Sequence, residues 1–381
     1  MNGVVAAGHP LTAEAGAEVL REGGNAVDAA VAAVLASFAV ESPLTGFGAG
    51  GFMMVSRGAE TTLIDFFVAA PGKDGIERGE ELVPVPVHFD EETVQTFYVG
   101  PASCGVPGTA AGLEQALMRF GTAAAADLVG AGVRLAREGA PINAIQAYIL
   151  EILWPIHERL AGTRELYAPQ GRPLGEGDVF RFPDLAEALE RFGAEGAAPF
   201  YSGEVAAALS GFVATHGGTL GPNDLASYEA IERRPLHAPF RGAEVWTNAP
   251  PSSGGILIAH TLGLLERLGP ESGPEQLVAA IDAANRARGE EFAEALYGEG
   301  LEAALLDPER LDLKAGDLLG STTHISVLDG HGLCASVTCS NGSGSGVLVP
   351  GTGVILNNML GEEDLNPLGF HAIAPGRRVP S

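Results

Sequence analysis

Residues 320–332 read Gly-Ser-Thr-Thr-His-Ile-Ser-Val-Leu-Asp-Gly-His-Gly, and the interpretation of the whole chain starts from this stretch. Between residues 323 and 328, apolar or β-branched residues alternate with polar ones, which is the period of a half-buried strand. The Asp-Gly-His-Gly segment at 329–332 is a turn signal, and residues 333–339 alternate again. The stretch therefore predicts a β-hairpin.

Thr322 stands at the entrance of the first predicted strand, directly after a flexible Gly-Ser step. Its hydroxyl could serve only to cap or decorate the strand edge. Alternatively, cleavage of the Ser321–Thr322 bond would give Thr322 a free α-amine beside its hydroxyl. Such an amine has a reference pKa of about 8, so near neutral pH it can take the proton of the hydroxyl and activate a nucleophile. The motif by itself leaves both interpretations open.

Several motifs elsewhere in the chain bear on this choice. These motifs are residues 23–32, 250–255, 322–327, 337–347 and 352–358. Together, and in this order, they resemble the γ-glutamyltranspeptidase family of N-terminal-nucleophile hydrolases. A series of long motifs over nearly the whole chain is far more specific than any single one.

The resemblance implies an α+β fold, an αββα four-layer sandwich of the N-terminal-nucleophile hydrolase type. The alternation of strands and helices in the sequence itself favours only an α/β or α+β fold. Local signals predict a helix that Thr12 caps, a second helix that Asn25 opens, and further helices at 123–138 and 276–297. They also predict a tight, closely packed loop at 46–51 and a surface excursion from Lys73 to about Tyr98. The resemblance also implies a large-subunit-like region at 1–321 and the start of a small-subunit-like region at 322–381.

The resemblance implies catalytic roles for two residues. Thr322 would be the nucleophile that first cuts its own peptide bond and then forms the acyl-enzyme. Ser340 matches a second hydroxyl residue that supports the nucleophile.

Three further residues match donor-binding positions of the family. Asn341 matches an asparagine at the α-amino end of the donor, and Glu362 matches the carboxylate that binds this amine. Glu363 and Asp364 are the alternatives to Glu362, and a carboxylate suits the role because an ammonium needs a charged acceptor. Ser381 matches the first serine of a pair that binds the donor carboxylate.

Phe67 is a departure from the family pattern. Where many members have Asp-Phe-Arg-Glu, with the arginine on the donor α-carboxylate, residues 65–68 read Asp-Phe-Phe-Val. If Phe67 faces the donor pocket, another cation must bind the carboxylate or the donor must differ. The candidate cations are Arg57, Lys73, Arg377 and Arg378. Alternatively, Phe67 turns into the core, as strand phenylalanines usually do.

The first alternative makes a prediction about substrate choice. The enzyme should prefer some other acyl amide to glutathione, and Phe67→Arg should raise γ-glutamyl hydrolysis.

Composition excludes some classes of partner. The 381 residues include 22 basic and 48 acidic ones, and a net charge of -26 argues against binding to nucleic acid. The longest apolar run, 29–40, is too short to span a membrane, and no signal-peptide pattern opens the chain. We therefore expect a soluble protein without a membrane or nucleic-acid partner, cytoplasmic on this sequence.

Three competing motifs are weaker. Residues 46–51 have the spacing of a dinucleotide fingerprint, but they are predicted to follow a helix and lead into a strand, which is the reverse of the required order. Cys334 and Cys339 are five residues apart and would point to opposite faces of a strand, which disfavours a metal site with His324 and His331. The serines at 343 and 345 lack the glycines of a hydrolase elbow. No cofactor and no metal are predicted.

The function expected from the resemblance is that of a γ-glutamyltranspeptidase-like acyl transferase or hydrolase. It would free Thr322 by self-cleavage, cut γ-glutamyl or related amides, and pass the acyl group to water or an amine. The large and small fragments of the chain would stay associated. The alternatives are an amidase or acylase of the same fold with another acyl specificity, and a catalytically silent homologue that only binds.

The resemblance also places a second serine and a Gly-Gly oxyanion hole after Ser381, the last residue of the sequence. We therefore expect residues 1–381 to be a truncated segment. Without oxyanion donors it should be poorly active, and with open sheet edges it should be prone to aggregate.

Overall fold

The computed structural model describes residues 3–79, 81–90, 93–269, 273–288, 291–306 and 322–381. The helices are α1 (Pro10–Glu22), α2 (Ala26–Val40), α3 (Thr109–Phe120), α4 (Ala125–Leu128), α5 (Gly130–Glu138), α6 (Ala144–His157), α7 (Ala161–Tyr167), α8 (Pro183–Glu195), α9 (Ala198–Tyr201), α10 (Glu204–Thr215), α11 (Pro222–Ala226), α12 (Ser253–Leu268), α13 (Pro274–Arg286), α14 (Phe292–Ala295) and α15 (Leu301–Leu305). The strands are β1 (Val4–Ala7), β2 (Gly50–Arg57), β3 (Glu60–Phe66), β4 (Val83–His88), β5 (Val94–Val99), β6 (Ala140–Pro141), β7 (Val179–Phe180), β8 (Ile231–Arg233), β9 (Leu236–Phe240), β10 (Ala243–Thr247), β11 (Thr323–Leu328), β12 (Leu333–Ser340), β13 (Leu348–Val349) and β14 (Val354–Ile355).

The predicted hairpin lies in the middle of the main sheet. Within the described residues, six antiparallel strands are ordered β1-β11-β12-β2-β3-β8, so β11 and β12 are flanked by strands from the start of the chain. Ile325 and Val327 on β11 are buried, whereas His324 and Leu328 are exposed, as the alternation predicted. The hairpin prediction is confirmed.

Helix α2 covers one face of this sheet. Every one of its residues is buried, and the helix contacts both β11 and β12. Asn25 caps it through a capping box with Asp28, as Asn25 was predicted to do. Most residues of α2 are alanine or valine, so α1 can approach α2 closely. A Cβ on Gly16 of α1 would lie 2.9 Å from the Ala29 carbonyl oxygen.

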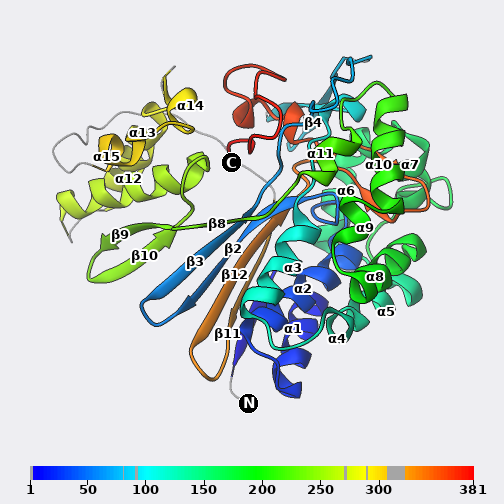
Figure 1. The fold of residues 1–381 in the computed structure, drawn as a ribbon, viewed down its shortest axis with the longest axis horizontal. Helices are drawn as coiled ribbons and strands as arrows, with labels where there is room; N and C mark the ends of the chain where they lie inside the picture. Colours follow the sequence, from blue (N-terminus) through cyan, green and yellow to red (C-terminus); the bar gives the residue numbers. More distant parts are fainter. Residues whose placement is uncertain (1–2, 80, 91–92, 270–272, 289–290, 307–321) are drawn as a thin grey trace.

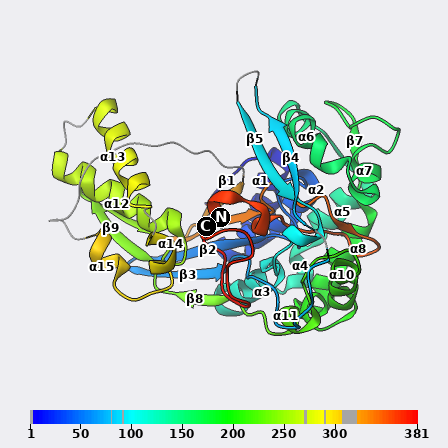
Figure 2. The same ribbon diagram turned by 90° about the horizontal axis from the view of Figure 1, so that it is seen from above.

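The rest of the molecule extends to both sides of the sheet. Figure 1 shows α1, α2, α3 and α8 on one side of the strands and the hairpin β9–β10 with α12 and α13 on the other. Figure 2, seen from above, separates the same two groups of elements. Helices together with antiparallel sheets confirm the predicted α+β class.

Several predicted boundaries were wrong. Thr12 does not cap the first helix; His9 does, because its Nδ1 accepts a hydrogen bond from the Leu11 N–H at 3.1 Å. The helix predicted at 123–138 is divided at Val129 into α4 and α5. The helix predicted at 276–297 ends at Arg286 as α13, and α14 is a separate short helix.

The segment from Lys73 to Tyr98 is more ordered than predicted. We expected a surface excursion, but it contains the hairpin β4–β5, whose inward residues Val85, Val87 and Phe97 pack against Leu153 and other residues of α6. Alternation of apolar residues along each strand is the physical reason, since it gives the hairpin one face to bury.

The glycine-rich loop at 46–51 connects α2 to β2 and packs closely, as predicted. A Cβ on Gly48 would lie 1.9 Å from the Ile355 carbonyl oxygen, so the backbones of the two segments meet directly. None of the helices in the described ranges is long and apolar enough to cross a membrane.

Candidate active site

Thr322 is an exposed residue immediately before β11. The register of the hairpin sets Thr323 opposite Cys339, so the next residue outward on each strand is Thr322 and Ser340, respectively. Ser340 is buried, and its hydroxyl accepts a hydrogen bond from the Gly342 N–H at 3.0 Å. The two residues predicted to be catalytic therefore lie at the same end of the hairpin. Ser321, and with it the bond predicted to be cleaved, lies outside the described residues.

The loop after Ser340 brings Asn341 and Glu362 together. The Ser343 N–H donates to Glu362 Oε1 at 2.9 Å, and the Asn358 N–H donates to the Asn341 carbonyl oxygen at 3.1 Å. Gly342 has φ of 66°, and a Cβ there would lie 2.4 Å from Asn358 Oδ1 and 2.5 Å from Glu362 Oε1. Only glycine fits this turn, because both side chains converge on it.

Buried polar atoms in this group have no partner in the described part of the chain. Asn341 is completely buried, yet neither its Nδ2 nor its Oδ1 forms a hydrogen bond, and Asn358 Oδ1 is also unpaired. An unsatisfied buried polar group costs about 1–3 kcal/mol. Such a cost is typical of a binding site, where a ligand supplies the missing partners.

Glu362 is the acid that joins this group. Its neighbours Glu363 and Asp364, the two alternatives from the sequence, are exposed. Burial raises the pKa of the Glu362 carboxyl to about 7, against the opposing effect of the Ser343 N–H. A bound ammonium would favour the ionised carboxylate.

Asn358 also belongs to this polar group, although the sequence did not single it out. Its Nδ2 donates to the Ser343 hydroxyl at 2.7 Å, whereas the side chain of its neighbour Asn357 is used to join Gly48 and Gly105. The two asparagines are adjacent in the sequence. Only packing shows that Asn357 binds backbone groups and that Asn358 faces the polar group.

Ser381 lies at the start of α12. Its carbonyl oxygen accepts hydrogen bonds from the Gly254 N–H at 2.7 Å and the Ser253 hydroxyl at 2.9 Å, and its own hydroxyl is buried without a partner in the described residues. Two motifs that the sequence singled out separately, 250–255 and Ser381, therefore meet. No hydrogen bond between described residues joins Ser381 to Asn341 or Glu362.

Phe67 is buried, with 6% of its surface exposed. Its ring stacks on Phe52 with centroids 5.3 Å apart, in an apolar cluster that also contains Met359 and Leu360. This is the core orientation, the second of the two alternatives from the sequence. An arginine at position 67 would be buried in this cluster, so the structure lends no support to a gain from Phe67→Arg. A role for Phe67 toward the donor stays a prediction.

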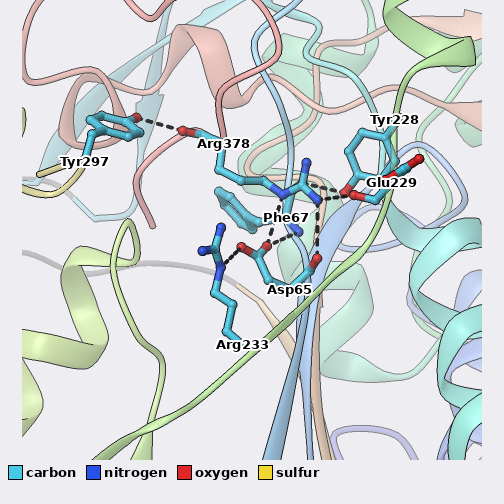
Figure 3. Close-up of polar contacts among 7 residues, drawn as sticks. All are labelled: Asp65, Phe67, Tyr228, Glu229, Arg233, Tyr297 and Arg378. Carbon is cyan, nitrogen blue, oxygen red and sulfur yellow. Dashed lines mark hydrogen bonds and ion pairs between the residues drawn. The ribbon is translucent and has the colours of Figure 1, made fainter. Parts of the chain in front are cut away.

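Arg378 is a candidate cation that binds this end of β3 through Asp65 (Figure 3). Its Nε donates to Asp65 Oδ1 at 3.2 Å, and its guanidinium lies over the Tyr228 ring, 4.4 Å from the centroid. Arg233, which was not among the candidate cations, donates to the other Asp65 oxygen at 2.7 Å. Two arginines from distant parts of the chain thus share the carboxylate two residues before Phe67.

The other candidate cations have different surroundings. Lys73 Nζ donates to the Ser227 hydroxyl at 2.7 Å, Arg377 lies 5.0 Å from the centroid of the Tyr297 ring, and Arg57 ends β2.

A threonine directly before a central strand, at the same end of the hairpin as a second hydroxyl residue and a buried polar group, is the arrangement expected for an N-terminal-nucleophile hydrolase. Solved structures of such enzymes share the fold. Cephalosporin acylase from Bacillus halodurans matches with a TM-score of 0.80 and 25% identity over 100% of this chain and 73% of the acylase chain. The γ-glutamyltranspeptidase of Helicobacter pylori matches with a TM-score of 0.68 and 29% identity over 80% of this chain and 88% of that one.

The chain belongs to the γ-glutamyltranspeptidase family. The family described as Gamma-glutamyltranspeptidase matches residues 12–381. The glutathione hydrolase proenzyme of Bacillus subtilis (strain 168) is 33% identical over 99% of this chain and 71% of its own length. The acylase ACY 1 proenzyme of Pseudomonas sp. (strain SE83) is 31% identical over 99% of this chain and 72% of its own length. These relatives confirm the predicted family and enzyme class, and they include both the glutathione hydrolase and the acylase alternatives.

Proposed function

We propose that this protein is a self-cleaving acyl transferase or hydrolase whose nucleophile is Thr322 and whose donor is a γ-glutamyl or closely related amide. The observation that carries the proposal is the position of Thr322 directly before the Thr323–Cys339 pair, at the end of the hairpin where Ser340 leads into the polar group of Asn341, Asn358 and Glu362. This polar group combines a carboxyl group with unpaired amide atoms, which suits the α-amino end of an amino-acid-like donor.

The proposed chemistry has two stages. The Thr322 hydroxyl attacks the Ser321 carbonyl, and water opens the resulting ester, which leaves a free α-amine on Thr322. This amine then takes the hydroxyl proton while the oxygen attacks the donor amide, and the donor's amine leaves with a proton. Water or an acceptor amine finally removes the acyl group from Thr322.

The order of strands supports continued association of the two fragments. The fragment that begins at Thr322 contributes β11 and β12, which pair with β1 and β2 of the other fragment. Separation would break the hydrogen bonds along both strand pairs and expose the apolar face that α2 covers.

Intact-mass measurement of the purified protein tests the proposal. We expect two fragments that separate between Ser321 and Thr322, and release of aniline from a γ-glutamyl anilide. A chain that stays uncut would instead support a silent homologue. Turnover only of acyl amides that lack an α-amino group would support the acylase alternative.

Glu362→Gln should raise the KM for a γ-glutamyl anilide by about 10- to 100-fold, because it removes a charged acceptor worth about 1.5–3 kcal/mol. A glutaryl anilide, which lacks the α-amino group, should be affected little. Glu363→Gln is the matched control, since Glu363 is the exposed neighbour. An equal rise in KM for both anilides would argue against ammonium binding by Glu362.

The KM of the wild-type protein should also depend on pH. Because burial raises the pKa of Glu362 to about 7, the ionised fraction of this carboxyl increases as pH rises through 7, and the wild-type KM should fall over that range.

A further inference from the structure

A cavity of about 130 Å³ adjoins Thr322. Thr322, Thr323 and His324 of the β11 segment line it, together with residues from the start of α1, the end of α2 and the start of α6. Its walls are otherwise mostly apolar, with one carboxyl group, that of Glu41.

Glu41 is the residue that follows α2, and it is 6% exposed. Its Oε2 is buried and forms no hydrogen bond within the described part of the chain. A Cβ on Gly8 would lie 3.0 Å from Oε1, so the segment before α1 closes over this carboxyl. Burial raises the pKa of Glu41 to about 7, and the neighbouring Thr323 hydroxyl opposes this effect.

The groups that face Glu41 bring no positive charge near neutral pH. His9 is buried, which lowers its pKa, and its Nδ1 accepts the Leu11 N–H, so the ring is neutral. His324 on β11 is more exposed, but partial desolvation lowers its pKa as well. From the start of α6 come Asn143 and Gln146, and the side-chain oxygen of each accepts a hydrogen bond from the backbone N–H of the other. Among the described residues, no lysine or arginine lines the cavity.

An ionised carboxylate that is buried without a cationic partner is unfavourable. A cation beside it would offset this cost. We propose that the cation is the α-amine which cleavage frees on Thr322, and that Glu41 is a positioning residue that holds this amine and sets its protonation state. The inference rests on the proposed function, because the amine exists only after the Ser321–Thr322 bond is cut.

Electrostatics determine in which direction Glu41 shifts the pKa of the Thr322 α-amine. A carboxylate close to the amine stabilises the ammonium form and therefore raises the pKa of the amine. The amine acts as a base only when neutral, so the rise in kcat/KM with pH should occur above the reference pKa of about 8. Removing the charge should move this rise to lower pH.

The test is the pH dependence of kcat/KM for wild type and Glu41→Gln, on protein whose cleavage has been verified by intact mass. We expect the acidic limb of Glu41→Gln to move to lower pH by about one unit, a tenfold change in proton concentration. Glu22→Gln is the matched control. Glu22 lies at the end of α1, much as Glu41 lies at the end of α2, but Glu22 is exposed. Glu41→Asp, which keeps the charge, should stay near wild type. An unmoved limb, or one that moves to higher pH, would overturn the inference.

A direct measurement covers the case in which Glu41→Gln does not fold. The rate at which cyanate carbamylates the Thr322 α-amine of the cleaved wild-type protein reports the pKa of that amine. A pKa above about 8 supports the inference, and a pKa at or below that reference overturns it. Absence of cleavage in the wild type would refute the proposed function itself, whereas cleavage and turnover with an unshifted amine would refute only the role of Glu41.

Discussion

Replacing Thr322 with alanine should leave a single uncut chain and reduce hydrolysis of a γ-glutamyl anilide by about 10⁴-fold or more. The methyl group removes the hydroxyl needed in both stages of the proposed chemistry: self-cleavage, and attack on the donor. Since the uncut chain also lacks the α-amine, the nucleophile and its base are lost together. Intact mass and a turnover assay measure the two consequences separately.

Two variants make this result specific to the Thr322 hydroxyl. Thr322→Ser keeps both the hydroxyl and the bond to be cut, so it should still yield two fragments, more slowly. Ser336→Ala removes a half-buried hydroxyl from β12 away from the end of the hairpin and should cleave and turn over like wild type. Two fragments split between 321 and 322 in Thr322→Ala would rule out the assignment of the nucleophile.

Asp65→Ala should lower the free energy of unfolding by about 3–5 kcal/mol, the cost of leaving a buried ionic partner unpaired. Asp65 is 1% exposed and binds both Arg233 and Arg378, and Arg378 is itself only 6% exposed (Figure 3). The same arginine also donates to the carbonyl oxygens of Asp65 and Glu229. Removing the carboxylate therefore leaves a buried guanidinium with backbone acceptors alone.

Urea unfolding of wild type and variants measures this effect. Glu232→Ala is the matched control: it lies beside Arg233 on β8, but its pair with Arg119 is on the surface and should contribute at most about 1 kcal/mol. Adding Arg378→Met to Asp65→Ala should restore part of the loss, because the unpaired buried charge is then removed. A loss in Asp65→Ala no larger than in Glu232→Ala would mean that the pair is not essential to the fold.

The Asp65–Arg378 pair also bears on the site. Arg378 and Ser381 belong to one short segment, which is further tied by the Tyr297 hydroxyl to the Arg378 carbonyl oxygen at 2.7 Å and by the Val379 N–H to the Val68 carbonyl oxygen at 2.9 Å. Without Asp65 this segment loses its charged attachment to β3. We therefore expect the hydrogen bonds of Ser381 to the start of α12 to weaken together with the stability.

Local sequence determined much of this protein. The alternation of residues at 323–339 was sufficient to predict the hairpin. Asn25, which forms a capping box with Asp28, was sufficient to predict the start of α2. Strand alternation and helix caps can be predicted in this way because they involve residues only a few positions apart. Motif order was enough for the family and for Thr322, Asn341 and Glu362 as candidates. The choice of Glu362 over Glu363 and Asp364 followed the motif; in the structure Glu362 is half-buried, whereas Glu363 and Asp364 are exposed.

Tertiary structure decided what the motifs left open. Phe67 turned into the core because Phe52, Met359 and Leu360 surround it, and no local pattern around 67 contains those residues. Asp65 and Arg378 are 313 positions apart in the chain, and Glu41 reaches the cavity beside Thr322 only because α2 packs beneath β11. Charge pairing and desolvation depend on which distant segments are buried together, so these partners could be identified only once the chain was folded.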